Sequence, residues 1–314
     1  MSVDEPAPLS VVILTFNEEA NLARCLESTA PWAAEVFVVD SGSTDQTVAI
    51  AERYGARVFE HSFENHVAQW QWALDNLPFG HEWMLAIDAD FAVTPELRDA
   101  ITAIAIGGGD AAGYYVRKRF IFRGRFIRHG GVYPNYRVVL FRRDAVFLDE
   151  SEIQDHHFYV HGRTGRLEQE LIEINANDDV MAFWIDKQLS SAERQAMEEI
   201  RHRRGGAGGP VKATPFGHHN QRVLWLEGIW SRLPLYWRSV FYFLYRYVLR
   251  GGFLDGRQGF LYHFTQALVY RILLDARIEE QRDQGLRASP AEPDSGERDV
   301  DVEGSQAGPE ASAH

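Results

Sequence analysis

Three apolar runs of strand length, each ending in polar or acidic residues, constrain the fold of this chain most. They occupy residues 9–15, 35–40 and 83–90, and helical patterns separate them. Continuous apolar runs rich in β-branched residues predict strands buried on both faces of a parallel sheet. Because ligands of open α/β sheets bind beyond the carboxyl ends of the strands, we expect a site at that edge. The side chains expected there are Thr15, Asn17, Asp40, Asp88 and Asp90.

The acidic pair at the end of the third run predicts a cation site. Asp88 and Asp90 are two positions apart, so both side chains can point into the same crevice. Mg²⁺ and Mn²⁺ prefer oxygen ligands and usually take one or two carboxylates, with the remainder from water and substrate phosphates. A nucleotide diphosphate is therefore the expected ligand that shares the metal with the two aspartates. Taken alone, the pair is also compatible with a solvated turn.

Composition indicates a folded globular chain with an acidic tail. The 314 residues are 45% hydrophobic and 25% charged. The formal net charge is −13, and residues 291–314 supply −6 of it, from seven acidic residues against Arg298. We expect that tail to be disordered, because it has few large apolar groups. The single cysteine, Cys25, excludes an internal disulfide and is expected as buried filler. The N-terminus lacks signal-peptide blocks, which predicts a cytosolic catalytic part.

Hydrogen-bonding chemistry suggests roles at the nucleotide site. Asp40 can accept from the amide or imide edge of a base, and Thr15 and Asn17 can bond its carbonyls and the ribose. Asp88 would contact the ribose or a metal-bound water, and Asp90 would hold the cation. Helix capping is the alternative for Asp40. The chain has no glycine-rich phosphate loop after its first strand, which disfavours a nucleotidyltransferase.

Three segments, residues 11–19, 38–45 and 85–90, resemble the successive signatures of family 2 glycosyltransferases with the GT-A fold. The likeness is greatest to bacterial lipopolysaccharide-core and polysaccharide glycosyltransferases. It implies an inverting, metal-dependent enzyme that uses a nucleotide sugar, often UDP-linked. In this family a helix equivalent to residues 66–74 often carries a basic residue, where this chain has Gln69 and Gln71. The predicted donor-binding residues are Thr15, Asn17, Glu18, Asp40, Ser41 and Asp88, with Asp90 and Asp88 on the metal.

Direct displacement at the sugar also requires a base near the attacking hydroxyl. In the resembled family a His-Glu or Glu-Asp base often follows the last core strands, and residues 149–157 occupy that place here. Asp155 is the first candidate and Glu152 the second, while a surface role remains open for both. His156, His157 and His161 can each add a metal ligand, but for each of them the sequence favours a histidine that binds no metal.

The C-terminal third differs from the rest in composition. Residues 224–264 are dense in Trp, Tyr and Phe, and Arg238, Arg246 and Arg250 recur at helical spacing on one stripe. We expect an interfacial amphipathic helix with aromatics in the headgroup boundary and arginines on anionic lipid. Packing on the catalytic domain or on another subunit is the alternative. The expected divisions are a GT-A catalytic domain (1–202), a glycine-rich linker (203–216), a helical membrane-associating or oligomerisation region (217–285) and the acidic tail (286–314).

Together these features predict an α/β GT-A fold with a C-terminal helical, membrane-proximal extension. The predicted function is an inverting glycosyltransferase that moves a sugar from a nucleotide-sugar donor to a lipid-linked or lipopolysaccharide-type acceptor. The expected partners include an anionic membrane surface at the cytosolic face of the inner membrane and exclude nucleic acid. A homo-oligomer through the C-terminal helices is left open. The alternative function is a catalytically silent membrane-associated scaffold.

Overall fold

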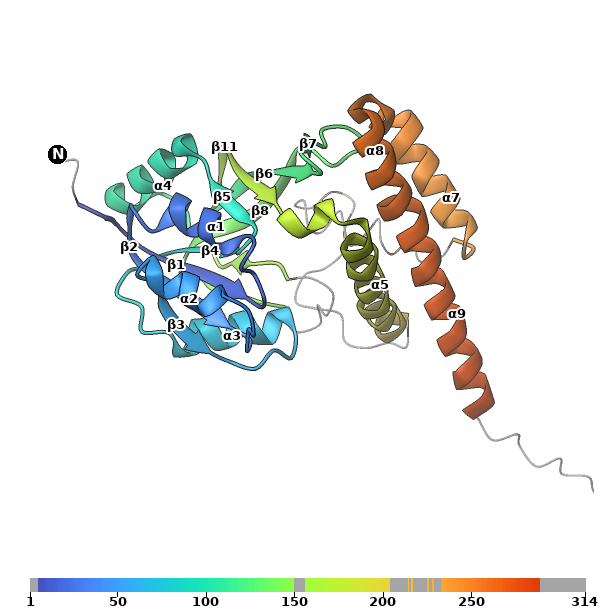
Figure 1. The fold of residues 1–314 in the computed structure, drawn as a ribbon, viewed down its shortest axis with the longest axis horizontal. Helices are drawn as coiled ribbons and strands as arrows, with labels where there is room; N and C mark the ends of the chain where they lie inside the picture. The colour runs from blue at the N-terminus through green and yellow to red at the C-terminus, as the bar shows by residue number, and fades with distance from the viewer. Residues whose placement is uncertain are drawn as a thin grey trace, which may run out of the picture.

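The sheet and the C-terminal helices lie side by side in the computed structural model of the protein (Figure 1). The structure describes residues 5–149, 156–203, 214, 216, 225, 228 and 233–288. Predicted base candidates Asp155 and Glu152 lie outside these residues, as do most of the linker and all of the acidic tail beyond residue 288.

The parallel half of the main sheet contains the strands that the apolar runs predict. Its order is β3 (Arg57–Glu60), β2 (Ala33–Asp40), β1 (Ala7–Thr15) and β4 (Trp83–Asp88), and all neighbours are parallel. Alternate residues of β1 enter different cores, because side chains of a strand point to opposite faces. Val11 and Ile13 face one core and Val12 the other.

A second group of strands extends the sheet beyond β4. The order continues with β8 (Asn135–Arg142), β6 (Gly113–Phe122), β11 (Thr164–Ile174) and β5 (Phe91–Val93). β8 is antiparallel to both β4 and β6, whereas β11 is parallel to β6 and antiparallel to β5. The short β7 (Arg125–Phe126) pairs with β6, and β9 (Val146–Phe147) pairs with β10 (Tyr159–Val160) separately.

Helices cover both faces of this sheet. The first core contains residues of α1 (Leu22–Thr29), α2 (Thr47–Arg53) and α4 (Pro95–Gly107), and the second contains those of α3 (His66–Asn76). Cys25 of α1 is fully buried, as predicted. Both ends of α4 are capped: Thr94 Oγ1 accepts from Leu97 N at 3.2 Å, and Gly108 takes a left-handed conformation, with φ of 80°.

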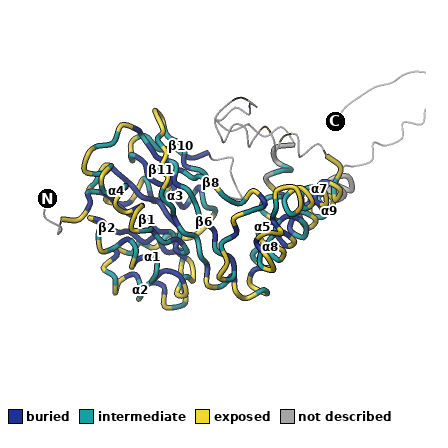
Figure 2. Tube along the Cα trace, turned by 90° about the horizontal axis from the view of Figure 1, so that it is seen from above, coloured by how far each residue is buried: buried dark blue, intermediate teal, exposed yellow. Residues whose placement is uncertain are grey.

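The C-terminal region forms helices that pack on one another. After η1 (Ala176–Asp179) comes α5 (Met181–Arg203), and α7 (Trp237–Leu244) continues as η2 (Tyr245–Leu249). The remaining elements are η3 (Gly252–Asp255), α8 (Gly256–His263), η4 (Phe264–Val269) and α9 (Tyr270–Ala288). α5 and α9 share a small core formed by Ala192, Ala196, Tyr270, Leu274 and Ile278. Figure 2 shows buried positions concentrated in the sheet and exposed ones along the outer turns of these helices.

Two arginines of the predicted stripe, Arg238 and Arg246, face inward, which contradicts the prediction that they lie on lipid, whereas Arg250 is exposed. Arg238 is buried, and its Nε donates to Asp275 Oδ1 at 2.7 Å while Nη1 donates to Glu199 Oε1 at 3.0 Å. Arg246 Nε donates to Gly130 O at 2.7 Å. The opposite face of the same helix is the exposed one. Its large apolar residues are Trp237, Phe241, Leu244, Tyr245, Val248 and Leu249.

A polar clamp joins the helical region to the sheet. Asp255, at the end of η3, accepts from His129 N at 2.8 Å, and its other oxygen lies 2.7 Å from His129 Nδ1. A Cβ on Gly252 would come within 2.5 Å of the buried His263 ring, so this turn requires a residue without a side chain. Trp184 of α5 adds a second joint, because its Nε1 donates to Thr265 Oγ1 at 2.8 Å and its ring packs on Phe122.

The predicted α/β GT-A class with a C-terminal helical extension is confirmed. Within the described ranges, no helix combines the length and the apolar character needed to cross a bilayer. Proximity of the helices to a membrane, and the predicted domain limits, stay predictions.

Candidate active site

The strand register brings the predicted polar residues to one edge of the sheet. Thr15 of β1 stands opposite Asp40 of β2, and Leu14 stands opposite Asp88 of β4. A cavity of about 830 Å³ opens at this edge. Of the predicted donor and metal residues, those lining it are Thr15, Glu18, Ser41, Asp88 and Asp90.

Asp40 and Asn17 are engaged in holding two loops together. Asp40 is buried and accepts from Thr15 Oγ1 at 2.9 Å and from Ser43 N at 2.7 Å. Asn17 has a left-handed backbone, with φ of 54°, and its Oδ1 accepts from Thr44 N at 2.9 Å. Neither residue is among those that line the cavity. Asp40 closes the turn after β2 and does not cap α2, which begins at Thr47. The contact of Asp40 and Asn17 with a base stays a prediction.

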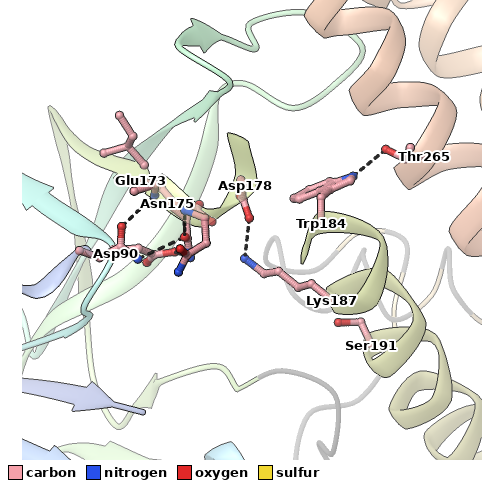
Figure 3. Close-up of polar contacts among 12 residues, drawn as sticks. Asp90, Glu173, Asn175, Asp178, Trp184, Lys187, Ser191 and Thr265 are labelled. Atoms are coloured by element: carbon pink, nitrogen blue, oxygen red, sulfur yellow. Dashed lines mark hydrogen bonds and ion pairs between the residues drawn. The ribbon is translucent and has the colours of Figure 1, made fainter. Parts of the chain in front are cut away.

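Carboxylates crowd the floor of the cavity. Burial, together with the charges of Glu173 and Asp88, raises the pKa of Asp90 to about 8. Asn175 Nδ2 lies 3.4 Å from Asp90 Oδ2, and Ile174 N donates to Asp90 O at 3.0 Å (Figure 3). Negative groups held this close in a buried place favour a cation beside them.

The oxygen donors fit Mg²⁺ or Mn²⁺ if substrate oxygens complete the coordination of the ion. Among the described residues, no group of three or more His, Cys, Asp or Glu side chains could hold a metal by itself. Asp88 and Asp90 supply the one or two carboxylates that such ions usually take from protein in nucleotide sites. Glu173 is less available, because it pairs with Lys118. The two aspartates therefore suit a metal shared with a diphosphate.

Asn21 and Asn175, which were not predicted from the sequence, organise this floor. Asn21 Nδ2 donates to Glu18 Oε2 at 2.7 Å and to Asn175 Oδ1 at 3.1 Å. Asn21 Oδ1 accepts from Ala176 N at 2.8 Å. The network thus fixes Glu18 against the end of β11. No sequence pattern connects positions so far apart along the chain.

Lys187 of α5 places a positive charge near these carboxylates. Its Nζ lies 3.5 Å from Oδ1 of the buried Asp178, as Figure 3 shows. Burial lowers the pKa of Lys187, but the charges of Asp178, Asp90 and Glu173 outweigh it and hold this pKa above its ordinary value. Lys187 was not predicted from the sequence, because α5 lies far along the chain from the aspartates.

α3 contains no lysine or arginine that could face the cavity. Gln69 is buried, and its Nε2 donates to Ser41 Oγ at 3.1 Å and to His61 O at 3.2 Å. This residue therefore positions the loop after β2. Gln71 is exposed and donates to Asp75. Lys187, from a helix far along the chain, lines the same cavity.

Two of the three predicted histidines reach the cavity. His156 and His157 line it, and His156 packs 5.6 Å from the Trp70 ring. His161 instead stacks on Phe147 at 4.4 Å and is not among the lining residues. Their roles as ligands stay untested, as does the role of the neighbouring Asp155 or Glu152 as base.

A parallel sheet edge with paired aspartates facing a nucleotide-sized cavity defines a GT-A-type nucleotide-binding domain. Comparison with known families agrees, because residues 10–163 match "Glycosyl transferase family 2". The N-terminal half of the chain is therefore a family 2 glycosyltransferase domain, as the sequence resemblance implied.

Curated relatives carry related names. An uncharacterized glycosyltransferase of Rickettsia felis is 44% identical over 96 residues, which cover 31% of this chain and 33% of the relative. The lipopolysaccharide core biosynthesis glycosyltransferase LpsC of Rhizobium meliloti is 33% identical over 117 residues, or 36% of this chain and 42% of LpsC. The chain thus spans about a third of the length of the first of these relatives.

Solved structures show more distant similarity. Mannosyltransferase PcManGT from Pyrobaculum calidifontis, in complex with GDP-Man and Mn²⁺, is 13% identical over 88% of each chain, with a TM-score of 0.49. S. aureus TarS 1–349 is 16% identical over 88% of this chain and 91% of that one, with a TM-score of 0.39. Similarity at this level transfers no site geometry.

Proposed function

We propose that the protein is an inverting, metal-dependent glycosyltransferase that uses a UDP-linked sugar. The observation that carries this proposal is the meeting of Asp88 and Asp90 on the floor of an 830 Å³ cavity, beside the ends of β1 and β2. The family match and the name of LpsC support a saccharide acceptor of the lipid-linked or lipopolysaccharide type. Both aspartates are present and face the cavity, which argues against a catalytically silent scaffold.

The lining residues divide the work of the reaction. Asp90 and Asp88 would hold Mg²⁺ or Mn²⁺, which when bound neutralises the phosphates of the donor. Lys187 adds a positive charge where the diphosphate leaves, held in place beside Asp178 at a half-buried position of the cavity. Thr15, Glu18 and Ser41 line the part of the cavity next to β1 and β2, where the nucleoside would lie. Asp155 or Glu152 would remove the proton of the attacking hydroxyl.

A thermal-shift screen tests this donor site. We expect UDP with Mn²⁺ to raise the melting temperature of the chain more than UDP or Mn²⁺ alone, because each completes the other's site. Asp90→Asn should abolish this joint effect. Asp99→Asn on α4 is the control, since Asp99 is exposed and pairs only with Arg98 among the described residues. An undiminished joint shift in Asp90→Asn would refute the metal assignment.

We further infer that the outer face of α7 and η2 rests on the cytosolic face of the inner membrane. Phe241, Leu244 and Leu249 are 60%, 45% and 77% exposed, an unusual gathering of large apolar groups. With Arg238 and Arg246 turned inward, apolar burial carries the attraction, and the exposed Arg250 adds charge.

Vesicle sedimentation tests the membrane surface. Phe241→Asp with Leu249→Asp should reduce binding to vesicles of anionic phospholipid, whereas Ile106→Asp on α4, also half-exposed, should leave it unchanged. Equal binding by both variants would contradict the assignment.

A further inference from the structure

The cavity has a second wall whose chemistry differs from that of the aspartate floor. This wall comes from α5 and the helices after it, and we call it the C-terminal wall. Within the described part of the chain, none of its lining residues beyond residue 180 is a carboxylate. Its polar members are Lys187, Gln188, Ser191, Arg194, Tyr242, Arg246, Tyr262, Gln266 and Tyr270. Almost all of these side chains can donate hydrogen bonds, so the wall suits an anion.

Two arginines of one helix show the contrast. Arg238 is neutralised by Asp275 and Glu199. Arg246, two turns further on, has no carboxylate partner in the described ranges, and its Nε is satisfied by the uncharged Gly130 O. Its guanidinium carbon lies 5.5 Å from the ring centre of Tyr242 and 5.9 Å from that of Tyr262. An enclosed guanidinium without a counter-ion is stabilised when an anion binds.

Arg194 and Gln266 add unsatisfied polar atoms at the same wall. Arg194 Nη2 donates to Ser191 Oγ at 3.3 Å, but its buried Nε has no partner among the described residues. The side-chain oxygen of Gln266 is likewise buried without a partner there. Both residues line the cavity, and Arg194 has no carboxylate partner among the described residues.

The charges around Tyr242, a member of this wall, are positive. Burial raises the pKa of the Tyr242 hydroxyl, but the charges of Arg246 and Arg271 outweigh it and hold that pKa below its ordinary value. An anionic ligand at the wall would therefore meet a favourable field as well as hydrogen-bond donors.

We propose that the C-terminal wall is the acceptor subsite and that the acceptor is a saccharide bearing a phosphate or a carboxylate, held by Arg194 and Arg246. This inference rests on the proposed glycosyltransferase function, which places the donor diphosphate on the aspartate floor. The wall faces the same cavity, so an acceptor held there presents its hydroxyl groups toward the donor. The tyrosine hydroxyls and Gln266 are suited to neutral sugar hydroxyls.

Binding of simple sugars to the chain loaded with UDP and Mn²⁺ tests the proposal. The probes are glucose 6-phosphate, glucuronate and glucose, measured by saturation-transfer NMR, and the first two distinguish a phosphate from a carboxylate subsite. At least one anionic sugar should bind about tenfold more tightly than glucose, and Arg194→Gln and Arg246→Gln should each remove most of that preference. Arg277→Gln is the matched control, because Arg277 is exposed and pairs with Glu280.

UDP affinity, measured on the same samples, separates this inference from the function on which it rests. It should be unchanged in all three variants. If the arginine variants lose UDP instead, the two residues belong to the donor site and the acceptor assignment is wrong. If all three sugars bind alike, or the variants keep the preference, the proposal is also overturned. If UDP fails to bind the unaltered chain, the proposed function itself fails. Arg246→Lys keeps the positive charge and should retain part of the preference for the anionic sugar. It therefore distinguishes loss of the charge from a folding defect in Arg246→Gln.

Discussion

Arg238→Met should strongly destabilise the helical region that carries the C-terminal wall. Arg238 and Asp275 each have 1% of the side chain exposed, and Glu199 has 14%. Methionine fills a similar volume but leaves Asp275 charged, buried and without its cation. Breaking a buried pair in this way costs about 3–5 kcal/mol. We expect the lower end, because Asp275 keeps its bonds from Tyr236 N at 2.7 Å and Ser239 Oγ at 3.0 Å.

Urea unfolding followed by circular dichroism measures this loss. Arg277→Met is the control, since its partner Glu280 is 55% exposed and exposed pairs contribute only about 0–1 kcal/mol. Arg238→Met combined with Asp275→Asn should recover part of the stability, because the buried negative charge is then gone. If Arg238→Met lowers the free energy of unfolding by less than about 1 kcal/mol, or if the double variant recovers none of it, the unpaired charge of Asp275 is not the cause of the loss.

Two further predictions concern the site and the clamp. Lys187→Gln should lower kcat on the order of 10²-fold, because a positive charge beside the leaving diphosphate is lost, and Lys187→Arg should keep part of the activity. Asp186→Asn, at an exposed neighbouring position, is the control and should leave kcat unchanged. Equal kcat values for all three variants would exclude this role of Lys187. Burial, then the charge of Arg246, lowers the pKa of His263 to about 4 against an ordinary 6.5. The unfolded chain therefore takes up this proton first, so the free energy of unfolding should fall by about 3 kcal/mol between pH 6.5 and pH 4 through this residue. Measured by urea unfolding across that pH range, the free energy of unfolding should fall less in His263→Gln than in the unaltered chain. Identical pH profiles of the two proteins would contradict the lowered pKa of His263.

Local sequence patterns determined the frame of the protein. The apolar runs of β1, β2 and β4 are long enough and apolar enough to be strands buried on both faces, so they predict their own place in the sheet. Thr94 and Gly108 end α4 through bonds and backbone angles that span only a few residues. The convergence of Asp88 and Asp90 with the end of β1 follows from the same regularity, because parallel neighbours end at one edge.

Tertiary structure alone decided which charges face the site. Spacing showed that α7 and η2 carry an arginine stripe and an apolar stripe, but not which stripe is buried, because burial of Arg238 requires carboxylates that compensate its charge. Those carboxylates, Glu199 and Asp275, come from α5 and α9 and reach Arg238 only in the folded chain. Lys187 joins the aspartates for the same reason: the chain folds back after β11, and no local pattern records which distant charge it will meet.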